Sequence, residues 1–136
     1  MPRVLAIDFG EKRIGLATCD ATGQVVAARR TLSRKSDAVA VREIARFCRE
    51  EEVEAVVIGI PRSPGGVESL FAGRARSFGD KLSREIDTPI DYHEETLTSW
   101  AAQREAAFQT KEEVDRGAAA ILLSDYLAML SSENRK

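Results

Sequence analysis

Three acidic residues, far apart in the chain, are the side chains best suited to chemistry: Asp8, Glu95 and Asp115. Asp8 follows four apolar residues, Glu95 follows a short strand-like segment, and Asp115 precedes a run of small residues. A buried carboxylate is costly unless it is paired or binds a cation. Carboxylate oxygens are ligands that Mg²⁺ and Mn²⁺ prefer, and two such ions can promote cleavage of a phosphodiester bond. The three acids therefore predict a divalent-metal site for phosphodiester hydrolysis.

Each acid also has a simpler structural interpretation. Asp8 can be a turn aspartate that accepts hydrogen bonds from nearby amides. Glu95 and Asp115 can be first-turn acids favoured by the helix dipole. Because strand residues alternate between faces, at most one of Glu94 and Glu95 shares a face with Asp8. Taken singly, the acids leave both interpretations open.

Residues that could hold a phosphate lie close to the first acid. Gly10 has no side chain, so a ligand could approach its backbone. Lys12 and Arg13 could contact a scissile or flanking phosphate, although a charged turn explains them equally well. Arg62 and a basic helix face could track a second backbone segment, and a solvated face is the alternative; the basic residues of that face are Arg74, Arg76, Lys81 and Arg84.

Five segments are typical of β-strands. Val4–Ile7 is wholly apolar and indicates a buried central strand. Arg13–Thr18 and Gln24–Leu32 follow after short turns, which predicts an antiparallel meander. Val53–Ile60 is rich in β-branched residues, and Pro89–Tyr92 gives a short fifth strand that would end just before Glu94 and Glu95.

Helices are expected between and after the later strands. Ser36 is a candidate N-cap for a helix that runs to Glu50. Further helices are expected at Val67–Ile86, Thr98–Phe108 and Glu112–Leu130. The order predicts an α/β fold with a mixed five-stranded sheet, in which three antiparallel, hairpin-linked strands and two parallel strands are flanked by helices. Residues 1–136 are expected to form a single domain.

Composition narrows the classes of function. The net charge of −2 argues against a general polyanion-binding protein, although residues 1–35 carry an excess of basic groups. No apolar run approaches a membrane span, and the N-terminus lacks a signal-peptide pattern, so we expect a cytoplasmic protein with no membrane association. Cys19 and Cys48 have no metal-binding or CxxC spacing, which favours buried, reduced thiols.

The chain resembles the YqgF/RuvX proteins, a bacterial branch of the RNase H-like nucleases. The resemblance spans nearly the whole chain and depends on four segments in the family's order: LAIDFGEKRIGLA at Leu5–Ala17, VIGIP at Val57–Pro61, EETLTS at Glu94–Ser99 and VDRGAAAIL at Val114–Leu122. The third segment departs from the family pattern, with Glu94 where Asp is common and Thr96 where Arg is common. That change makes the choice of Glu95 over Glu94 depend on register.

The resemblance implies an RNase H-like nuclease domain in which Asp8, Glu95 and Asp115 match the family's acidic positions and hold Mg²⁺ or Mn²⁺. It implies a nucleic-acid substrate, either the 5′ end of precursor 16S ribosomal RNA in ribosome biogenesis or a four-way DNA (Holliday) junction in recombination and repair. Resolution of a two-fold junction would require a homodimer, whereas RNA end trimming would not, so a monomer and a homodimer both remain open.

Two alternatives belong to other classes. Asp8-Phe-Gly10, with Asp20 downstream, is similar to the phosphate-binding turn of actin-like ATPases and sugar kinases. Those proteins bind the nucleotide between two domains of this kind. A chain of 136 residues has room for one such domain, so its length argues against this alternative. The other alternative is a non-catalytic nucleic-acid-binding or ribosome-assembly protein that retains the fold.

Overall fold

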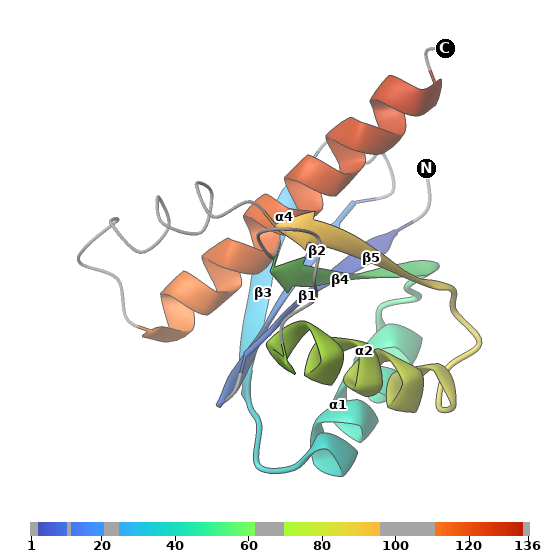
Figure 1. Cartoon of the computed structure of the whole chain (residues 1–136). Coiled ribbons are helices and arrows are strands. Elements are labelled where there is room, and N and C mark those ends of the chain that lie inside the picture. Colours follow the sequence, from blue (N-terminus) through green and yellow to red (C-terminus); the bar gives the residue numbers. More distant parts are fainter. Residues whose placement is uncertain (1–2, 11, 21–24, 62–69, 96–110, 135–136) are drawn as a thin grey trace.

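One mixed sheet forms the centre of the molecule (Figure 1). The computed structural model describes residues 3–10, 12–20, 25–61, 70–95 and 111–134, with the backbone alone for Pro61, Glu95 and residues 111–116 and 132–134. The sheet has the order β3-β2-β1-β4-β5, in which β1 to β3 are antiparallel and β4 and β5 run parallel to β1. This confirms the predicted mixed five-stranded sheet. Its strands are β1 (Val4–Phe9), β2 (Arg13–Cys19), β3 (Val26–Ser33), β4 (Ala55–Pro61) and β5 (Ile90–Glu95).

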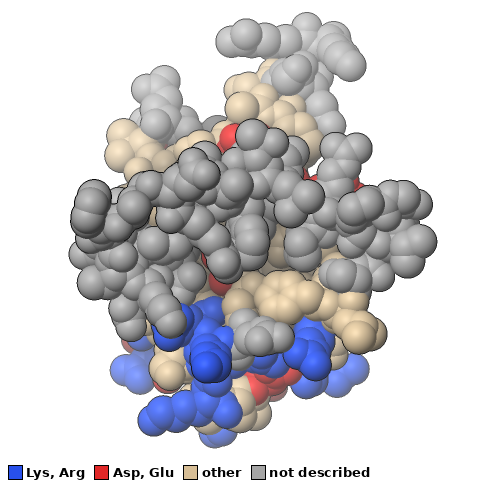
Figure 2. Space-filling view, turned by 60° about the vertical axis from the view of Figure 1, so that its left-hand side comes forward, with Lys and Arg blue, Asp and Glu red and all other residues tan. Residues whose placement is uncertain are grey.

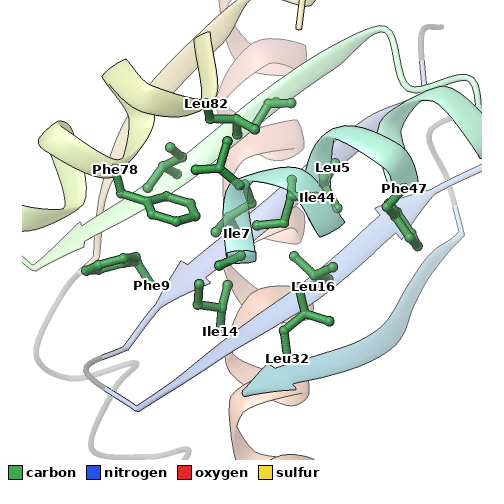
Figure 3. Close-up of a cluster of buried hydrophobic side chains, with 14 of the residues drawn as sticks. Leu5, Ile7, Phe9, Ile14, Leu16, Leu32, Ile44, Phe47, Phe78 and Leu82 are labelled. Atoms are coloured by element: carbon green, nitrogen blue, oxygen red, sulfur yellow. The ribbon is translucent and has the colours of Figure 1, made fainter. Parts of the chain in front are cut away.

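Helices cover both faces of this sheet. On one face lie α1 (Asp37–Glu50) and α2 (Leu70–Ser83), and α4 (Lys111–Asn134) crosses the other (Figure 1). Strand alternation divides the core accordingly, because Leu5 and Ile7 pack with α1 and α2 whereas Val4 and Ala6 pack against α4. Figure 3 shows the first of these clusters, including the contact of the Phe9 and Phe78 rings.

Helix α1 begins where the sequence predicts and ends in a tight turn. The Ser36 hydroxyl accepts a hydrogen bond from the Val39 amide at 3.2 Å, as an N-cap does. At the other end Glu52 adopts φ 54°, and the Val53 amide donates to the Cys48 carbonyl at 2.9 Å. These are the features of a Schellman turn. Val53 therefore belongs to this turn, and β4 begins two residues later than its sequence suggests.

Other boundaries differ from the sequence prediction for local reasons. The amides of Arg84 and Glu85 bond to carbonyls three residues back, so α2 ends at Ser83 instead of Ile86. Strand β5 continues through Glu95, because its pairing with β4 extends to the last residue of that strand. The helix expected at Thr98–Phe108 lies outside the described residues. Within the described helices, none has both the length and the apolar composition to cross a membrane.

The edge strand β3 carries an irregularity in its pairing with β2. Leu16 pairs with Arg30, but Ala17 pairs with Ala28, so Arg29 is an extra residue on β3. Such a bulge lets two consecutive side chains lie on one side of the strand. Both arginines accordingly lie over the Phe47 ring of α1, with guanidinium carbons 5.7 and 6.0 Å from its centroid.

Helix α2 approaches β5 closely at Gly79, which is buried. A Cβ atom at this position would lie 2.1 Å from the Tyr92 hydroxyl oxygen and 3.0 Å from Cδ1 of Ile58. The tyrosine is held by two further contacts with α2, since its hydroxyl donates to the Arg76 carbonyl at 3.3 Å and its ring lies 4.8 Å from the Arg76 guanidinium. The absent side chain of Gly79 is what allows this packing.

Candidate functional site

Asp8 is the half-buried, next-to-last residue of β1. Strand alternation gives it the same face as Val4 and Ala6, the face that α4 covers. Its partner on β2 is Gly15. On the other side, the pairing of β1 with β4 ends at Ile7 and Ile58, and Gly59 is the next residue of β4.

A glycine is therefore the β2 partner of Asp8, and Gly59 comes one residue after the last β4 residue paired with β1; neither has a side chain to crowd the Asp8 carboxylate. Gly15 and Gly59 were not among the site residues predicted from the sequence. Their register with the first acid was the signal that could have identified them.

The β5 register separates the two adjacent glutamates. Tyr92 packs against the core that lies under α1 and α2, so Glu94, two residues later, occupies that face. His93 and Glu95 occupy register positions on the opposite face, the one that carries Asp8. Glu95 pairs with Pro61 and is the last residue of β5.

Helix α4 runs antiparallel to β1 on the face that carries Asp8. The hydroxyl of Tyr126 donates to the Asp91 carboxylate at 3.0 Å, and its ring meets His93 edge-on at 5.9 Å. These contacts fix the second half of α4 against β5, and the first half extends toward the carboxyl end of β1 (Figure 1).

Helical periodicity places position 115 on the stripe of α4 that faces the sheet. Asp115 is eleven residues before Tyr126, which is about three turns. Ala119, Leu122 and Tyr126 follow Asp115 at successive intervals of four, three and four residues, so all four positions lie on one stripe of the helix. The three later residues are buried against the sheet. The backbone thus gives all three predicted acids positions on one side of the sheet. Their meeting at a single ion stays a prediction.

Three carboxylates are a donor set that suits Mg²⁺ or Mn²⁺, because both are hard cations that prefer oxygen ligands. Within the part of the chain whose side chains are described, which excludes those of Glu95 and Asp115, no three acidic, histidine or cysteine side chains lie together as a metal site requires. The donor chemistry therefore fits the ion, and Asp8 is the member of the set whose side chain is described.

The predicted phosphate-binding residues lie at the turn between β1 and β2. A Cβ atom on Gly10 would be 2.4 Å from the Arg13 carbonyl oxygen, so this glycine is already required by the turn. Lys12 is exposed, and its carbonyl accepts a hydrogen bond from the Arg34 amide at 2.8 Å. Arg13 is half-buried at the start of β2. Arg62 lies outside the described residues.

Arg34, which the sequence analysis did not single out as a site residue, lies next to this turn. Its guanidinium is 4.5 Å from the centroid of the Phe9 ring, one residue after Asp8. It also donates to the Asp37 carboxylate at 2.8 Å, and Lys81 donates to the same carboxylate at 2.9 Å. Burial raises the pKa of Asp37, but the two hydrogen-bonded cations outweigh burial and lower that pKa below its ordinary value.

Basic side chains gather on one part of the surface (Figure 2). Figure 2 shows lysine and arginine side chains gathered along the lower part of this face, with a few acidic side chains between them. The negative net charge of the chain therefore coexists with a locally basic surface. Such a surface attracts polyanions at short range.

The strand order, the helices on both faces and the acid at the end of the first strand define an RNase H-like α/β domain. Solved structures agree with this fold. Thermus thermophilus RuvC superposes with a TM-score of 0.62 at 14% identity, covering 96% of each chain. The fowlpox virus resolvase bound to Holliday junction DNA gives a TM-score of 0.57 at 10% identity, covering 94% of this chain and 98% of the other.

Sequence comparison then identifies the family. The family model described as "RuvX: Holliday junction resolvase" matches residues 2–129. A protein of Gloeobacter violaceus named "Putative pre-16S rRNA nuclease" is 37% identical over 97% of this chain and 87% of its own length. A protein of the same name from Crocosphaera subtropica is 36% identical over 90% of each chain. The chain belongs to the RuvX family, as the resemblance in its sequence predicted.

Proposed function

We propose that this protein is a metal-dependent nuclease that hydrolyses phosphodiester bonds at the 5′ end of precursor 16S ribosomal RNA. One observation carries the proposal: the positions of Asp8, Glu95 and Asp115 all lie on the same side of the sheet. Asp8 is at the end of β1, Glu95 lies on this side by the register of β5, and Asp115 by its position on helix α4. The names of the relatives, "Putative pre-16S rRNA nuclease", support the choice of RNA as substrate.

In this proposal Asp8, Glu95 and Asp115 hold Mg²⁺ or Mn²⁺. The bound ions supply an activated water and stabilise charge on the leaving oxygen. The protein's own residues orient the substrate. Gly15 pairs with Asp8 and adds no side chain beside its carboxylate, and Lys12 and Arg13 contact phosphates that flank the scissile bond. Arg62 is a further candidate for phosphate binding.

A second candidate function is resolution of Holliday junctions. It is favoured by the description of the family model and by the likeness in fold to two resolvases. The same acids would act, but the substrate would be branched DNA, and a homodimer would bring one site to each of two strands. Oligomeric state therefore bears on which substrate is used.

The test compares Asp8→Asn with the matched exchange Asp125→Asn, which removes the same charge from an exposed position on α4. Each protein is incubated with a 5′-extended 16S precursor RNA and with a four-way DNA junction, in Mg²⁺, in Mn²⁺ and in EDTA. We expect Asp8→Asn to lose at least about 100-fold in cleavage rate, the scale of one preorganised electrostatic group, and Asp125→Asn to keep the parent rate.

Stability measurements separate a metal ligand from a structural residue. We expect the circular dichroism spectrum of Asp8→Asn to match that of the parent, and Mg²⁺ to raise the unfolding temperature of the parent more than that of the variant. Cleavage of the junction alone would favour the second candidate. If the parent protein is well folded and cleaves neither substrate, the nuclease proposal is wrong, and the alternative of a non-catalytic nucleic-acid-binding protein is favoured.

A further inference from the structure

We propose that the groove between α1 and α2 is a second contact for the sugar–phosphate backbone of the substrate. The groove lies on the face of the sheet opposite to the acidic site, and the backbone would reach it around the end of β1, past Arg34. The inference depends on the proposed function in one respect, that the substrate is a nucleic acid. The groove encloses about 370 Å³ and is lined by Ala38, Val41, Arg42, Lys81, Arg84 and Glu85.

The lining of this groove has the chemistry of an anion site. Three of its residues are basic, and Glu85 is the acidic residue among them. The Arg84 guanidinium has no hydrogen bond or ion pair within the described part of the chain. Arg42 makes a long 3.5 Å bond to the Ala38 carbonyl of its own helix. Guanidinium groups without a carboxylate partner are well suited to phosphate oxygens, which they bind in bidentate geometry.

A ring contact and two hydrogen bonds connect the groove to the end of β1. Arg34 lies on the Phe9 ring, and Asp37 accepts hydrogen bonds from both Arg34 and Lys81. Lys81 in turn lines the groove. One carboxylate therefore fixes two cations in place, and the trio keeps a positive charge. The result is a row of basic groups that begins beside Phe9 at the end of β1, on the face of the sheet opposite to Asp8, and ends between the two helices.

The length of this row suits more than one phosphate. Arg42 is five residues along α1 from Asp37, which corresponds to about 7.5 Å of helix axis. A phosphate bound at Arg42 would therefore be a different phosphate from one held beside Arg34. Contacts of this kind bind the backbone and do not read the base sequence.

The test measures how binding depends on salt. All proteins carry Asp8→Asn to prevent cleavage, and the probe is a fluorescein-labelled precursor 16S RNA segment, with a four-way DNA junction as a second probe. The groove variant is Arg42→Gln with Arg84→Gln. The control is Arg46→Gln with Arg49→Gln, which removes the same charge from exposed positions of α1 outside the groove.

A plot of the logarithm of the binding constant against the logarithm of the salt concentration falls with a slope set by the number of phosphate contacts. We expect this slope to be less steep by about 1.4 in the groove variant, which corresponds to the loss of two phosphate contacts to a single strand. The control variant should have the same slope as the parent. Equal slopes for the groove variant, the control and the parent would overturn the groove contact and leave the nuclease proposal intact. If the parent bound neither probe, the nuclease proposal and the groove contact would both be wrong.

Discussion

Replacement of Gly79 by alanine tests whether close packing of α2 on β5 is required for stability. The new methyl group would lie 2.1 Å from the Tyr92 hydroxyl oxygen and 3.0 Å from its Cζ atom, far inside a van der Waals contact. The tyrosine ring is rigid and is backed by Arg76, so it can move away only by giving up its contacts with α2. Gly73 offers a matched control in the same helix, because its added Cβ would meet nothing within 4 Å.

The magnitudes decide the sign of each effect. Both exchanges gain about 0.8–1.0 kcal/mol from the higher helix propensity of alanine. At Gly79, overpacking typically costs about 1–3 kcal/mol. Loss of the Tyr92 hydrogen bond and of its contact with the Arg76 guanidinium adds about 1 kcal/mol. We therefore expect Gly79→Ala to destabilise the protein by about 1–3 kcal/mol and Gly73→Ala to stabilise it by up to about 1 kcal/mol.

Urea denaturation followed by circular dichroism measures both free energies of unfolding. A third variant, Tyr92→Phe, removes the oxygen that the new methyl group meets. We expect the double variant Gly79→Ala with Tyr92→Phe to lose about 1 kcal/mol less free energy of unfolding than the sum of the losses in the two single variants. Gly79→Ala as stable as Gly73→Ala, or an additive double variant, would show that this account of the α2–β5 contact is wrong.

Two further predictions concern the ends of α1. Glu52 has a φ of 54°, a left-handed conformation that glycine adopts without strain. We therefore expect the Glu52→Gly variant to have a free energy of unfolding about 1 kcal/mol higher than the Glu52→Ala variant, as measured by urea denaturation. Equal stabilities of the two variants would contradict this. The pKa of Asp37 is lowered in the folded protein, so its contribution to stability is present above the unfolded value of about 4 and is lost as the pH falls through the folded pKa. We expect Asp37→Asn to be less stable than the parent at pH 7, by about 1 kcal/mol, and the difference in free energy of unfolding to shrink as the pH falls below the unfolded value. A difference that stays the same in acid would mean that Arg34 and Lys81 do not act through this carboxylate.

The sequence predicted the central sheet well because its strands carry strong local signals. Val4–Ile7 is wholly apolar, and the short turns that follow permit only antiparallel neighbours. The N-cap at Ser36 was equally local, since a hydroxyl before a helix satisfies an amide of the first turn. Signals of this kind do not depend on the rest of the fold.

The features that were missed depend on partners distant in sequence. Strand β5 includes two glutamates because β4 offers it a partner as far as Pro61, and no local propensity reveals that. The closing turn of α1 uses Glu52 in a conformation typical of glycine, so the sequence lacked its usual marker.

The candidate site also depends on contacts between segments distant in sequence. The alternation between Glu94 and Glu95 was readable from the chain, but which of them shares a face with Asp8 required the register with β4. Arg34 was missed because its role depends on Phe9 and Asp37, which come from different elements.

The bulge on β3 has a consequence for how these molecules behave when crowded. An exposed edge strand is a template onto which a strand of another molecule can pair, and long regular edges promote aggregation. Here the extra residue Arg29 interrupts the regular spacing of backbone hydrogen-bond donors and acceptors along β3. Arg29 and Arg30 also place two adjacent positive charges on this edge strand. A strand arriving from a second copy would meet mismatched hydrogen bonds and like charge. We therefore expect this edge to oppose sheet-to-sheet polymerisation of the protein.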